Sequence, residues 1–192
     1  VVLADERLQR LRDGSLLLVS GEKLPTVQIK RSTDDGETWT VVGGFDLRKF
    51  GLKTHYAVSH LLEASDGSWF LASSDLFPRT ESVSENRPRE RIQVFCSRDL
   101  GKNWELRALL DTYASSGHSG SEVSILEMPD GRLVIYARES REDGYPAFRV
   151  FSQDRGETWS QPEDLPIQIS GRVKADFLSD GRIMLTTRTY MG

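Results

Sequence analysis

One eight-residue pattern, S-x-D-x-G-x-(T/N)-W, occurs three times in this chain of 192 residues. The copies occupy residues 32–39, 97–104 and 152–159, at intervals of 65 and 55 residues. A pattern that returns in this way indicates a supersecondary unit copied along the chain. In each copy the Asp can bond its own downstream backbone, the Gly can adopt a positive φ, and the Trp can pack on apolar side chains. The pattern therefore predicts one recurring turn.

A second repeat runs in step with the first. Asp-Gly pairs between two apolar runs begin at Asp13, Asp66, Asp130 and Asp180, at intervals of 53, 64 and 50 residues. An Asp-Gly pair in this setting predicts a tight hairpin. One unit then reads strand, Asp-Gly turn, strand, variable loop, strand, Asp-containing turn, strand. An antiparallel four-stranded unit of this length is typical of a propeller blade, so we expect an all-β fold.

The repeats fill the chain without a domain boundary, and no segment has convincing helical periodicity. We expect one partial propeller domain over residues 1–192, with about three and a half four-stranded blades. Closed propellers have four to eight blades, and open sheet edges favour association. The remaining blades are therefore expected from the same longer chain or from another subunit. The expected blades are residues 7–48, 58–112, 122–168 and the first half of a fourth from residue 173.

Three local predictions follow from the same alignment of repeats. The last strand of the first blade is expected at residues 38–42 and that of the third blade at residues 158–160. Residues 114–121, which are rich in Ser and Gly, are expected to form a loop.

Composition excludes several classes of protein. The formal net charge is -4, 28% of residues are charged and 38% are hydrophobic, as in ordinary globular domains. No apolar run is long enough to span a bilayer, and the mildly acidic balance gives no reason to expect a nucleic-acid partner. The three His are scattered, no Cys/His spacing fits zinc, and no phosphate-binding glycine loop is present. We therefore expect no metal and no cofactor.

The order of strands predicts which face of the domain carries a site. In an up-and-down blade, the Asp-Gly turn and the Asp-containing turn lie on one face. The starts of first strands, the ends of second strands and the loops that follow them lie on the opposite face. Because loops on a rigid scaffold commonly carry function, we expect the site there and a structural role for the repeated turns.

The face predicted to carry the site is rich in polar residues. Arg138 and Arg188 each follow the Asp of an Asp-Gly pair by eight residues, so they occupy equivalent positions in adjacent blades. Together with Arg7 they are expected to point toward the propeller axis. Three guanidiniums repel one another unless an anionic ligand such as a carboxylate lies between them. The polar residues of this face are Arg7, His55, Tyr56, Glu122 and Arg172 at first-strand starts, and Glu22, Asp75, Arg138 and Arg188 at second-strand ends.

The alternative is that these arginines are solvated or paired with neighbouring carboxylates. Glu139, Glu142 and Asp143 are close enough in sequence to neutralise Arg138, and Glu6 adjoins Arg7. Charge clusters also occur for structural reasons, so position alone does not separate these two interpretations.

The three Asp-containing turns resemble the Asp-boxes of sialidases (neuraminidases) and their relatives, which are six-bladed propellers, and the similarity covers essentially the whole chain. Asp-boxes indicate a fold more than a function. A closer similarity begins at Glu122, which is followed by Glu127 after five residues and Arg138 after sixteen. The resemblance implies that Glu122 is the base toward a tyrosine nucleophile. It also implies that Arg7, Arg138 and Arg188 bind a substrate carboxylate.

Two departures from the family pattern concern the catalytic groups. The sialidase acid/base Asp belongs to the loop that is residues 21–26 here, where Glu22 is the only carboxyl. The adjacent Lys23 would lower the pKa of Glu22, against the needs of a proton donor. The tyrosine nucleophile comes from a late blade, and Tyr190 lies too early in the chain to be its equivalent.

We therefore expect a sialidase-like, exo-acting glycoside hydrolase that acts on glycans with an anionic sugar such as sialic acid. Asp75, His55 and Tyr56 are further candidate substrate contacts. One alternative is another propeller enzyme, either an exo-arabinanase or a uronate lyase in which His55, Tyr56 or His118 serves as base. A second alternative is a glycan-binding propeller without catalysis. The family resemblance alone favours a secreted or periplasmic location.

Overall fold

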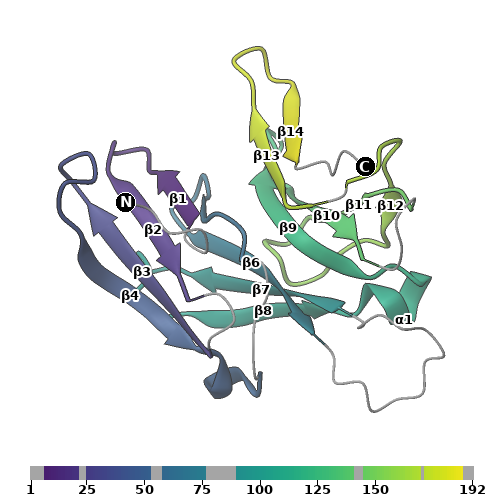
Figure 1. Cartoon of the computed structure of the whole chain (residues 1–192), viewed down its shortest axis with the longest axis horizontal. Coiled ribbons are helices and arrows are strands. Elements are labelled where there is room, and N and C mark those ends of the chain that lie inside the picture. The colour runs from purple at the N-terminus through teal and green to yellow at the C-terminus, as the bar shows by residue number, and fades with distance from the viewer. Residues whose placement is uncertain are drawn as a thin grey trace.

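The computed structural model shows three four-stranded antiparallel sheets followed by a two-stranded one. The sheets succeed one another in chain order, from β1 to the β13–β14 hairpin (Figure 1). Within each four-stranded sheet, neighbours in sequence are neighbours in space, so the predicted up-and-down order is confirmed. The structure describes residues 7–21, 25–52, 58–76, 90–140, 145–169 and 171–187, with backbone only at 75 and 76.

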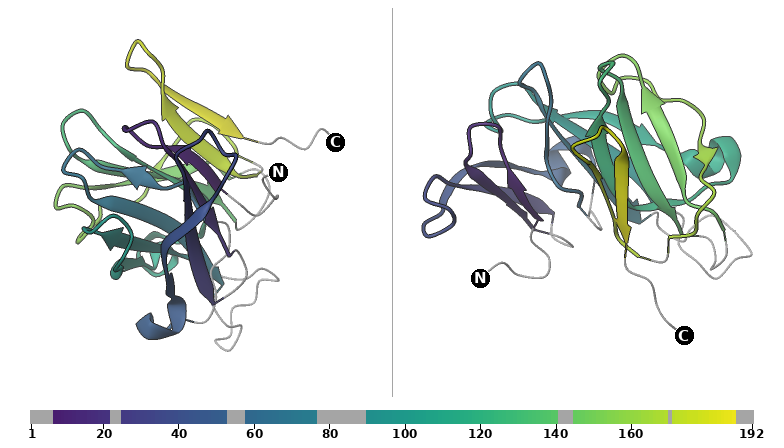
Figure 2. Two further views of the ribbon diagram at one scale, coloured as in Figure 1. Left: turned by 90° about the vertical axis from the view of Figure 1, so that its left-hand side faces the viewer. Right: turned by 90° about the horizontal axis from the view of Figure 1, so that it is seen from above.

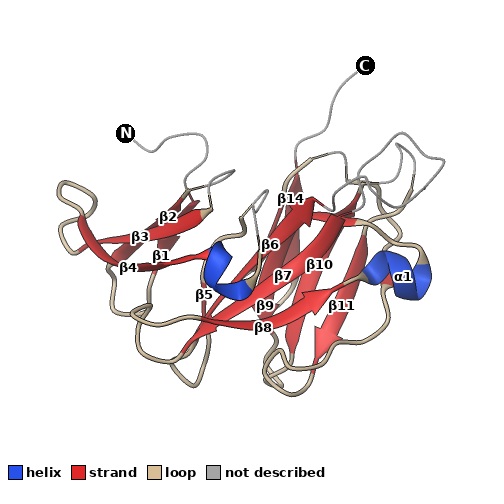
Figure 3. Ribbon diagram, turned by 90° about the horizontal axis from the view of Figure 1, so that it is seen from below, coloured by secondary structure: helices blue, strands red, loops and turns tan. Residues whose placement is uncertain are grey.

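The strands of the first two sheets are β1 (Arg7–Arg10), β2 (Leu16–Ser20), β3 (Thr26–Ser32), β4 (Thr40–Asp46), β5 (Leu62–Glu63), β6 (Trp69–Leu76), β7 (Glu90–Ser97) and β8 (Glu105–Leu110). Those of the other two are β9 (Gly120–Glu127), β10 (Leu133–Glu139), β11 (Phe148–Ser152), β12 (Glu163–Asp164), β13 (Val173–Phe177) and β14 (Ile183–Thr187). Two short helices, η1 (Leu47–Phe50) and α1 (Thr112–Ser116), are the blue segments of Figure 3.

Helix α1 corrects the prediction of a loop over residues 114–121. Asp111 caps the helix by accepting a bond from the Ala114 amide at 3.0 Å, and Gly117 ends it with φ 77°. Strand β9 then begins at Gly120. A five-residue helix is too short to produce a recognisable amphipathic period, so the sequence pattern did not reveal it.

The last strands of two sheets differ from their predicted positions. In the third sheet, Ser160 bonds Phe151, but the strand itself is Glu163–Asp164 rather than residues 158–160. Pro162 intervenes, and proline has no N–H to donate to a ladder. In the first sheet, β4 continues through Gly43, where an added Cβ would lie 2.0 Å from the Gly101 carbonyl oxygen. That glycine allows the first and second sheets to approach closely.

Each Asp-box is closed by hydrogen bonds from its own residues. In the first, Asp34 Oδ1 accepts bonds from the Ser32 hydroxyl at 2.6 Å and the Thr38 amide at 2.9 Å. The Trp39 indole donates to the Gly36 carbonyl at 3.0 Å. The Ser32 and Thr38 hydroxyls are the main cause that lowers the Asp34 pKa to about 2. The same contacts recur in the boxes of Asp99 and Asp154.

Apolar side chains fill the space between successive sheets. One cluster joins the first two sheets and includes Ile29, Phe45 and Phe95, with the Phe45 and Phe95 ring centroids 4.5 Å apart. A second cluster, around Phe70 and Phe148, joins the second and third sheets. A third joins the third sheet to β13. Sheet therefore packs on sheet along the chain, as the two views of Figure 2 show.

Arg155 of the third Asp-box links the second and third sheets at the end that carries the Asp-Gly turns and Asp-boxes, here called the turn end. Its guanidinium pairs with Asp66 at 2.5 Å and with Glu127 at 2.5 Å. Glu127 also accepts a bond from the Ser65 hydroxyl at 2.7 Å. Glu127 thus lies far from the start of β9, and its contacts join neighbouring sheets.

Candidate functional site

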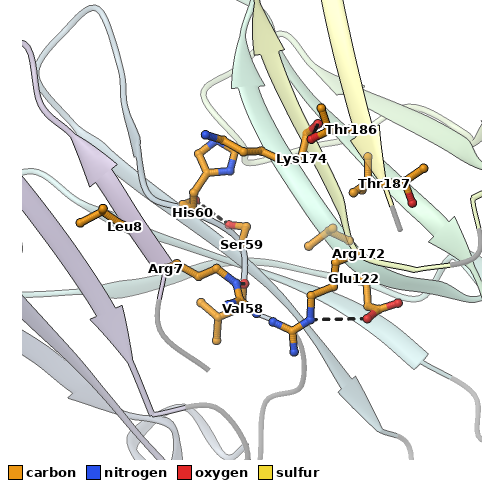
Figure 4. Close-up of a pocket in the computed structure, with 12 residues that line it drawn as sticks. Arg7, Leu8, Val58, Ser59, His60, Glu122, Arg172, Lys174, Thr186 and Thr187 are labelled. Atoms are coloured by element: carbon orange, nitrogen blue, oxygen red, sulfur yellow. Dashed lines mark hydrogen bonds and ion pairs between the residues drawn. The ribbon is translucent and has the colours of Figure 1, made fainter. Parts of the chain in front are cut away.

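A cavity of about 340 Å³ lies among the first strands of all four sheets. Arg7 begins β1, residues 58–60 lead into β5, Glu122 lies on β9, and Arg172 precedes β13 (Figure 4). These residues lie at the opposite ends of their strands from the Asp-Gly turns, as the predicted strand order requires. We call this end of the sheets the cavity end. The lining residues are Arg7, Leu8, Val58, Ser59, His60, Glu122, Val123, Arg172, Val173, Lys174, Thr186 and Thr187.

Glu122 has the most unusual backbone in the cavity. Ser124 pairs with Tyr136 and Ser121 pairs with Arg138, so Glu122 and the residue after it face one residue of β10. The extra residue is a β-bulge, and Glu122 has a left-handed φ of 48° there. A non-glycine residue in this region carries about 1–2 kcal/mol of strain, and such residues cluster at functional sites. The bulge directs this carboxylate into the cavity.

Two arginines from different strands reach the Glu122 carboxylate. Arg138 Nε lies 2.6 Å from Oε2, and Arg172 Nε lies 3.5 Å from Oε1, so each oxygen has one arginine. The Glu122 side chain is only 7% exposed. A carboxylate so far removed from water requires cationic partners of this kind. Figure 4 shows Arg172 reaching Glu122 across the cavity.

Arg7 forms another part of the wall and joins two sheets. Its Nε donates a hydrogen bond to the Val58 carbonyl at 3.1 Å. Arg7, Arg138 and Arg172 all use Nε for these contacts, whereas four of the five guanidinium N–H donors are on the terminal nitrogens. The terminal end of each fork is the part that suits a carboxylate or another planar anion.

His60 and Lys174 lie side by side in the cavity (Figure 4). His60 is 9% exposed. Burial, and then the positive charge of Lys174, lowers its pKa to about 4, while Asp176 acts weakly in the other direction. The imidazole is therefore neutral above that pH and offers one donor and one acceptor. Lys174 Nζ lies 3.4 Å from the Asp176 carboxylate.

The structure brings together part of the predicted site. Arg7 and Glu122 line one cavity, and Arg138 pairs with Glu122 rather than lining the wall itself. Their roles in binding and catalysis stay predictions. Asp75 is described in its backbone only. Four predicted site residues, Glu22, His55, Tyr56 and Arg188, lie outside the described residues, as do Glu142 and Asp143.

Three cavity residues were not assigned to the site from sequence. Arg172 was recognised only as a polar residue at a strand start, and His60 and Lys174 were missed. Their positions relative to the Asp-Gly turns could have identified them. His60 and Lys174 precede the Asp of their Asp-Gly turn by six residues, like Arg7, and Arg172 precedes its Asp by eight, like Glu122.

His118 does not line the cavity. Its Nε2 lies 2.9 Å from Asp164 and its Nδ1 lies 2.9 Å from the Ser116 hydroxyl. Among the described residues, no group of His, Cys, Asp or Glu side chains could hold a metal ion. In the same part of the chain, no helix has the length and apolar character needed to cross a membrane.

Comparison with protein families gives a match over nearly the whole chain. A model described as a BNR repeat-like domain matches residues 9–189. The chain belongs to this family. Membership confirms the resemblance to sialidase and BNR-repeat proteins that the Asp-boxes suggested.

Individual relatives of this BNR repeat-like chain are distant glycan-acting proteins. A sialidase of Clostridium perfringens is 23% identical over 218 residues, which cover 96% of this chain and 55% of that protein. A GH93 alpha-L-arabinofuranosidase of Fusarium graminearum has a TM-score of 0.68 at 20% identity, with 94% and 55% of the two chains covered. An alpha-L-arabinanase of Penicillium chrysogenum has a TM-score of 0.65, with the same identity and coverage. The chain thus spans about half the length of these relatives.

Proposed function

We propose that the protein carrying this chain is an exo-acting glycoside hydrolase that removes an anionic sugar, such as sialic acid, from the end of a glycan. The observation that carries this proposal is the position of Glu122 between Arg138 and Arg172, in a cavity with Arg7 on its wall. The scaffold that we propose is a six-bladed propeller to which residues 1–192 contribute the blades expected from the repeats. The distant sialidase relative supports both parts of the proposal.

The charges of the cavity favour an anionic ligand. Arg7, Arg172 and Lys174 line it, and Glu122 is the one acid in its described lining. Lys174 is near Asp176, but that acid does not line the cavity. A sugar carboxylate that accepts paired N–H donors from these arginines would balance the excess of positive charge.

Glu122 is proposed as the base toward a tyrosine supplied by a part of the protein outside this chain. The tyrosine oxygen would attack the anomeric carbon while its proton passes to Glu122, which keeps a second lone pair on each oxygen. The bond to the leaving oxygen would break as a carboxylic acid protonates that oxygen, and Glu22 is our candidate for this acid. Water would then release the sugar from the covalent intermediate. The arginines of the cavity would hold the sugar carboxylate throughout.

Release of 4-methylumbelliferone from its sialoside by the full-length protein tests this proposal. We expect turnover by the wild type and a fall in kcat of about 10²–10⁴-fold in Glu122→Gln, the range for loss of a positioned acid or base. Sialoside binding without any product would instead support a glycan-binding propeller. If the folded protein neither bound nor cleaved the sialoside, an anionic sugar would be ruled out as the substrate.

A second candidate, an exo-acting arabinan hydrolase, is favoured by one specific observation. Two solved structures similar to this fold are an arabinanase and an arabinofuranosidase, each complexed with arabinobiose. Arabinose is neutral and gives no reason for several arginines in one cavity, so we rank this candidate second. Incubation of the same protein with linear arabino-oligosaccharides, followed by chromatography of the products, distinguishes the two.

A further inference from the structure

Glu90 is a buried carboxyl that the proposed mechanism does not use. It begins β7, directly opposite Leu76 of β6, and is 4% exposed. Its amide donates to the Ser119 hydroxyl at 3.0 Å, which ties the start of β7 to the residue that precedes β9, the strand that carries Glu122. Glu90 does not line the cavity, but it lies near Glu122, which does, and near Arg138, the partner of Glu122.

The groups around the Glu90 side chain come from three strands. Ser74 of β6 and Ser121 of β9 are polar but uncharged neighbours. Arg138 of β10 attracts the charged form of Glu90, and Glu122 of β9 repels it. A further buried acid, Glu139 of β10, accepts a bond from the Ser119 amide at 3.1 Å.

Burial dominates this environment. It raises the pKa of Glu90, and the lowering influences of Ser121, Arg138 and Ser74 do not offset it. The geometry points the same way, because Glu90 Oε2 is buried and has no hydrogen-bond partner among the described residues. Burial of an oxygen without a hydrogen-bond partner costs much more free energy when the carboxyl is ionised than when it is a neutral acid.

We propose that Glu90 is a positioning residue for the Glu122–Arg138 pair. It packs beside the pair as a neutral carboxylic acid, not as a second carboxylate. A neutral Glu90 fills the space beside the pair without competing for Arg138. An ionised Glu90 would add a negative charge beside Glu122 and would compete with Glu122 for the Arg138 guanidinium. Glu90 would thereby leave Arg138 paired with Glu122, the base of the proposed mechanism, and would add no negative charge near the bound anionic sugar. This last step rests on the proposed function.

The protonation state is tested without any ligand. We compare the free energy of unfolding in urea from pH 4 to 8 for the wild type, Glu90→Gln and the control Glu163→Gln, which removes an exposed carboxyl paired with Arg149. A raised folded-state pKa means that the folded protein keeps a proton which the unfolded chain loses as pH rises. The wild type should therefore lose stability relative to Glu90→Gln across this range, and Glu163→Gln should not reproduce the effect.

Two results would overturn the proposal in that experiment. In the first, the difference in unfolding free energy between wild type and Glu90→Gln does not change with pH. In the second, the wild type becomes more stable relative to Glu90→Gln as pH rises. If Glu90→Gln does not fold, the infrared carbonyl band of a protonated carboxyl in the wild type decides. Its persistence above the pH range in which ordinary carboxyls ionise supports the proposal, and its loss within that range contradicts it.

The positioning role is tested with N-acetylneuraminic acid as the probe in the full-length protein. Glu90→Gln should bind within about threefold of wild type at pH 5, whereas Glu90→Ala should bind at least about tenfold more weakly because the pair loses its support. As pH rises, wild-type affinity should fall more than that of Glu90→Gln. Equal losses in both variants would reject a neutral acid. If no protein binds the probe, the proposed function fails, while the unfolding data still decide the state of Glu90.

Discussion

At the turn end of the sheets, the Asp34 carboxylate is held by side chains and amides from its own eight-residue turn. At the cavity end, the Glu122 carboxylate is held by Arg138 of a neighbouring strand and Arg172 of another sheet. The first arrangement is local and is repeated in each box. The second depends on long-range packing and on a strained backbone. Carboxylates therefore stabilise the turns at one end, whereas at the other end the carboxylate is the one that we propose as a catalytic base.

The largest expected effect tests this comparison with two acids of the same strand. Glu122 and Glu127 both lie on β9, one at each end of the sheets. Glu122→Gln should lower kcat by about 10²–10⁴-fold, whereas Glu127→Gln should leave kcat within about twofold and lower stability instead. Glu127 loses its charged contact with Arg155 in that variant. Steady-state kinetics and urea unfolding of both variants provide the test, and similar kcat values for the two would refute the division of roles.

Arg155→Ala should destabilise the protein without affecting the cavity. The change removes the contacts with Asp66 and Glu127, and the arginine side chain is 28% exposed. We expect a loss of about 2 kcal/mol, less than for a fully buried ion pair. Arg182→Ala is the matched control, because its pair with Asp180 is largely exposed and should contribute little. Equal losses in thermal unfolding would show that Arg155 does not join the sheets.

His60→Phe should weaken sugar binding moderately, because it removes a hydrogen-bonding ring and keeps a planar one. We expect about a tenfold rise in Kd, the order of one neutral hydrogen bond. Because the His60 pKa is about 4, the wild-type contact should not titrate between pH 5 and 7. His118→Phe, whose ring lies outside the cavity, should bind normally. Calorimetry at pH 5 and 7 measures both effects, and a ratio of the His60→Phe Kd to the wild-type Kd that differs strongly between these pH values would contradict a neutral His60.

The smallest expected effect concerns the boxes in acid. The pKa of Asp154 is lowered to about 2, first by the Thr158 hydroxyl. A lowered folded-state pKa gives stability that is present above the unfolded value, near 4, and is lost as pH falls toward 2. Asp154→Asn should therefore reduce the pH dependence of urea unfolding in that window. Glu37→Gln, at an exposed position of the first box, should not, and an unchanged slope in Asp154→Asn would contradict the assignment.

The sequence predicted the turn end better than the cavity end, for a physical reason. The hydrogen-bond partners of the Asp34 side chain lie within four residues of it, so the residue spacing alone predicts the geometry of the turn. Glu122 and Arg138 were singled out by their positions in the repeats and by the family resemblance, and both lie in one hairpin, whereas Arg172 reaches Glu122 from the next sheet. Its partner depends on how the sheets pack, and residue spacing does not encode that. The need for glycine at position 43 was likewise not predictable, because it arises from the close approach of Gly101 in the next sheet.

The link from Arg155 to the preceding sheet has a consequence for how the molecule opens. The contacts of Arg155 with Asp66, of Gly43 with Gly101 and of Arg172 with Glu122 each join two adjacent sheets. Such a chain of pairwise couplings behaves as a one-dimensional cooperative array. Amide hydrogen exchange should then show protection in graded blocks, each one sheet wide, and weakening of a single junction should divide the blocks at that point.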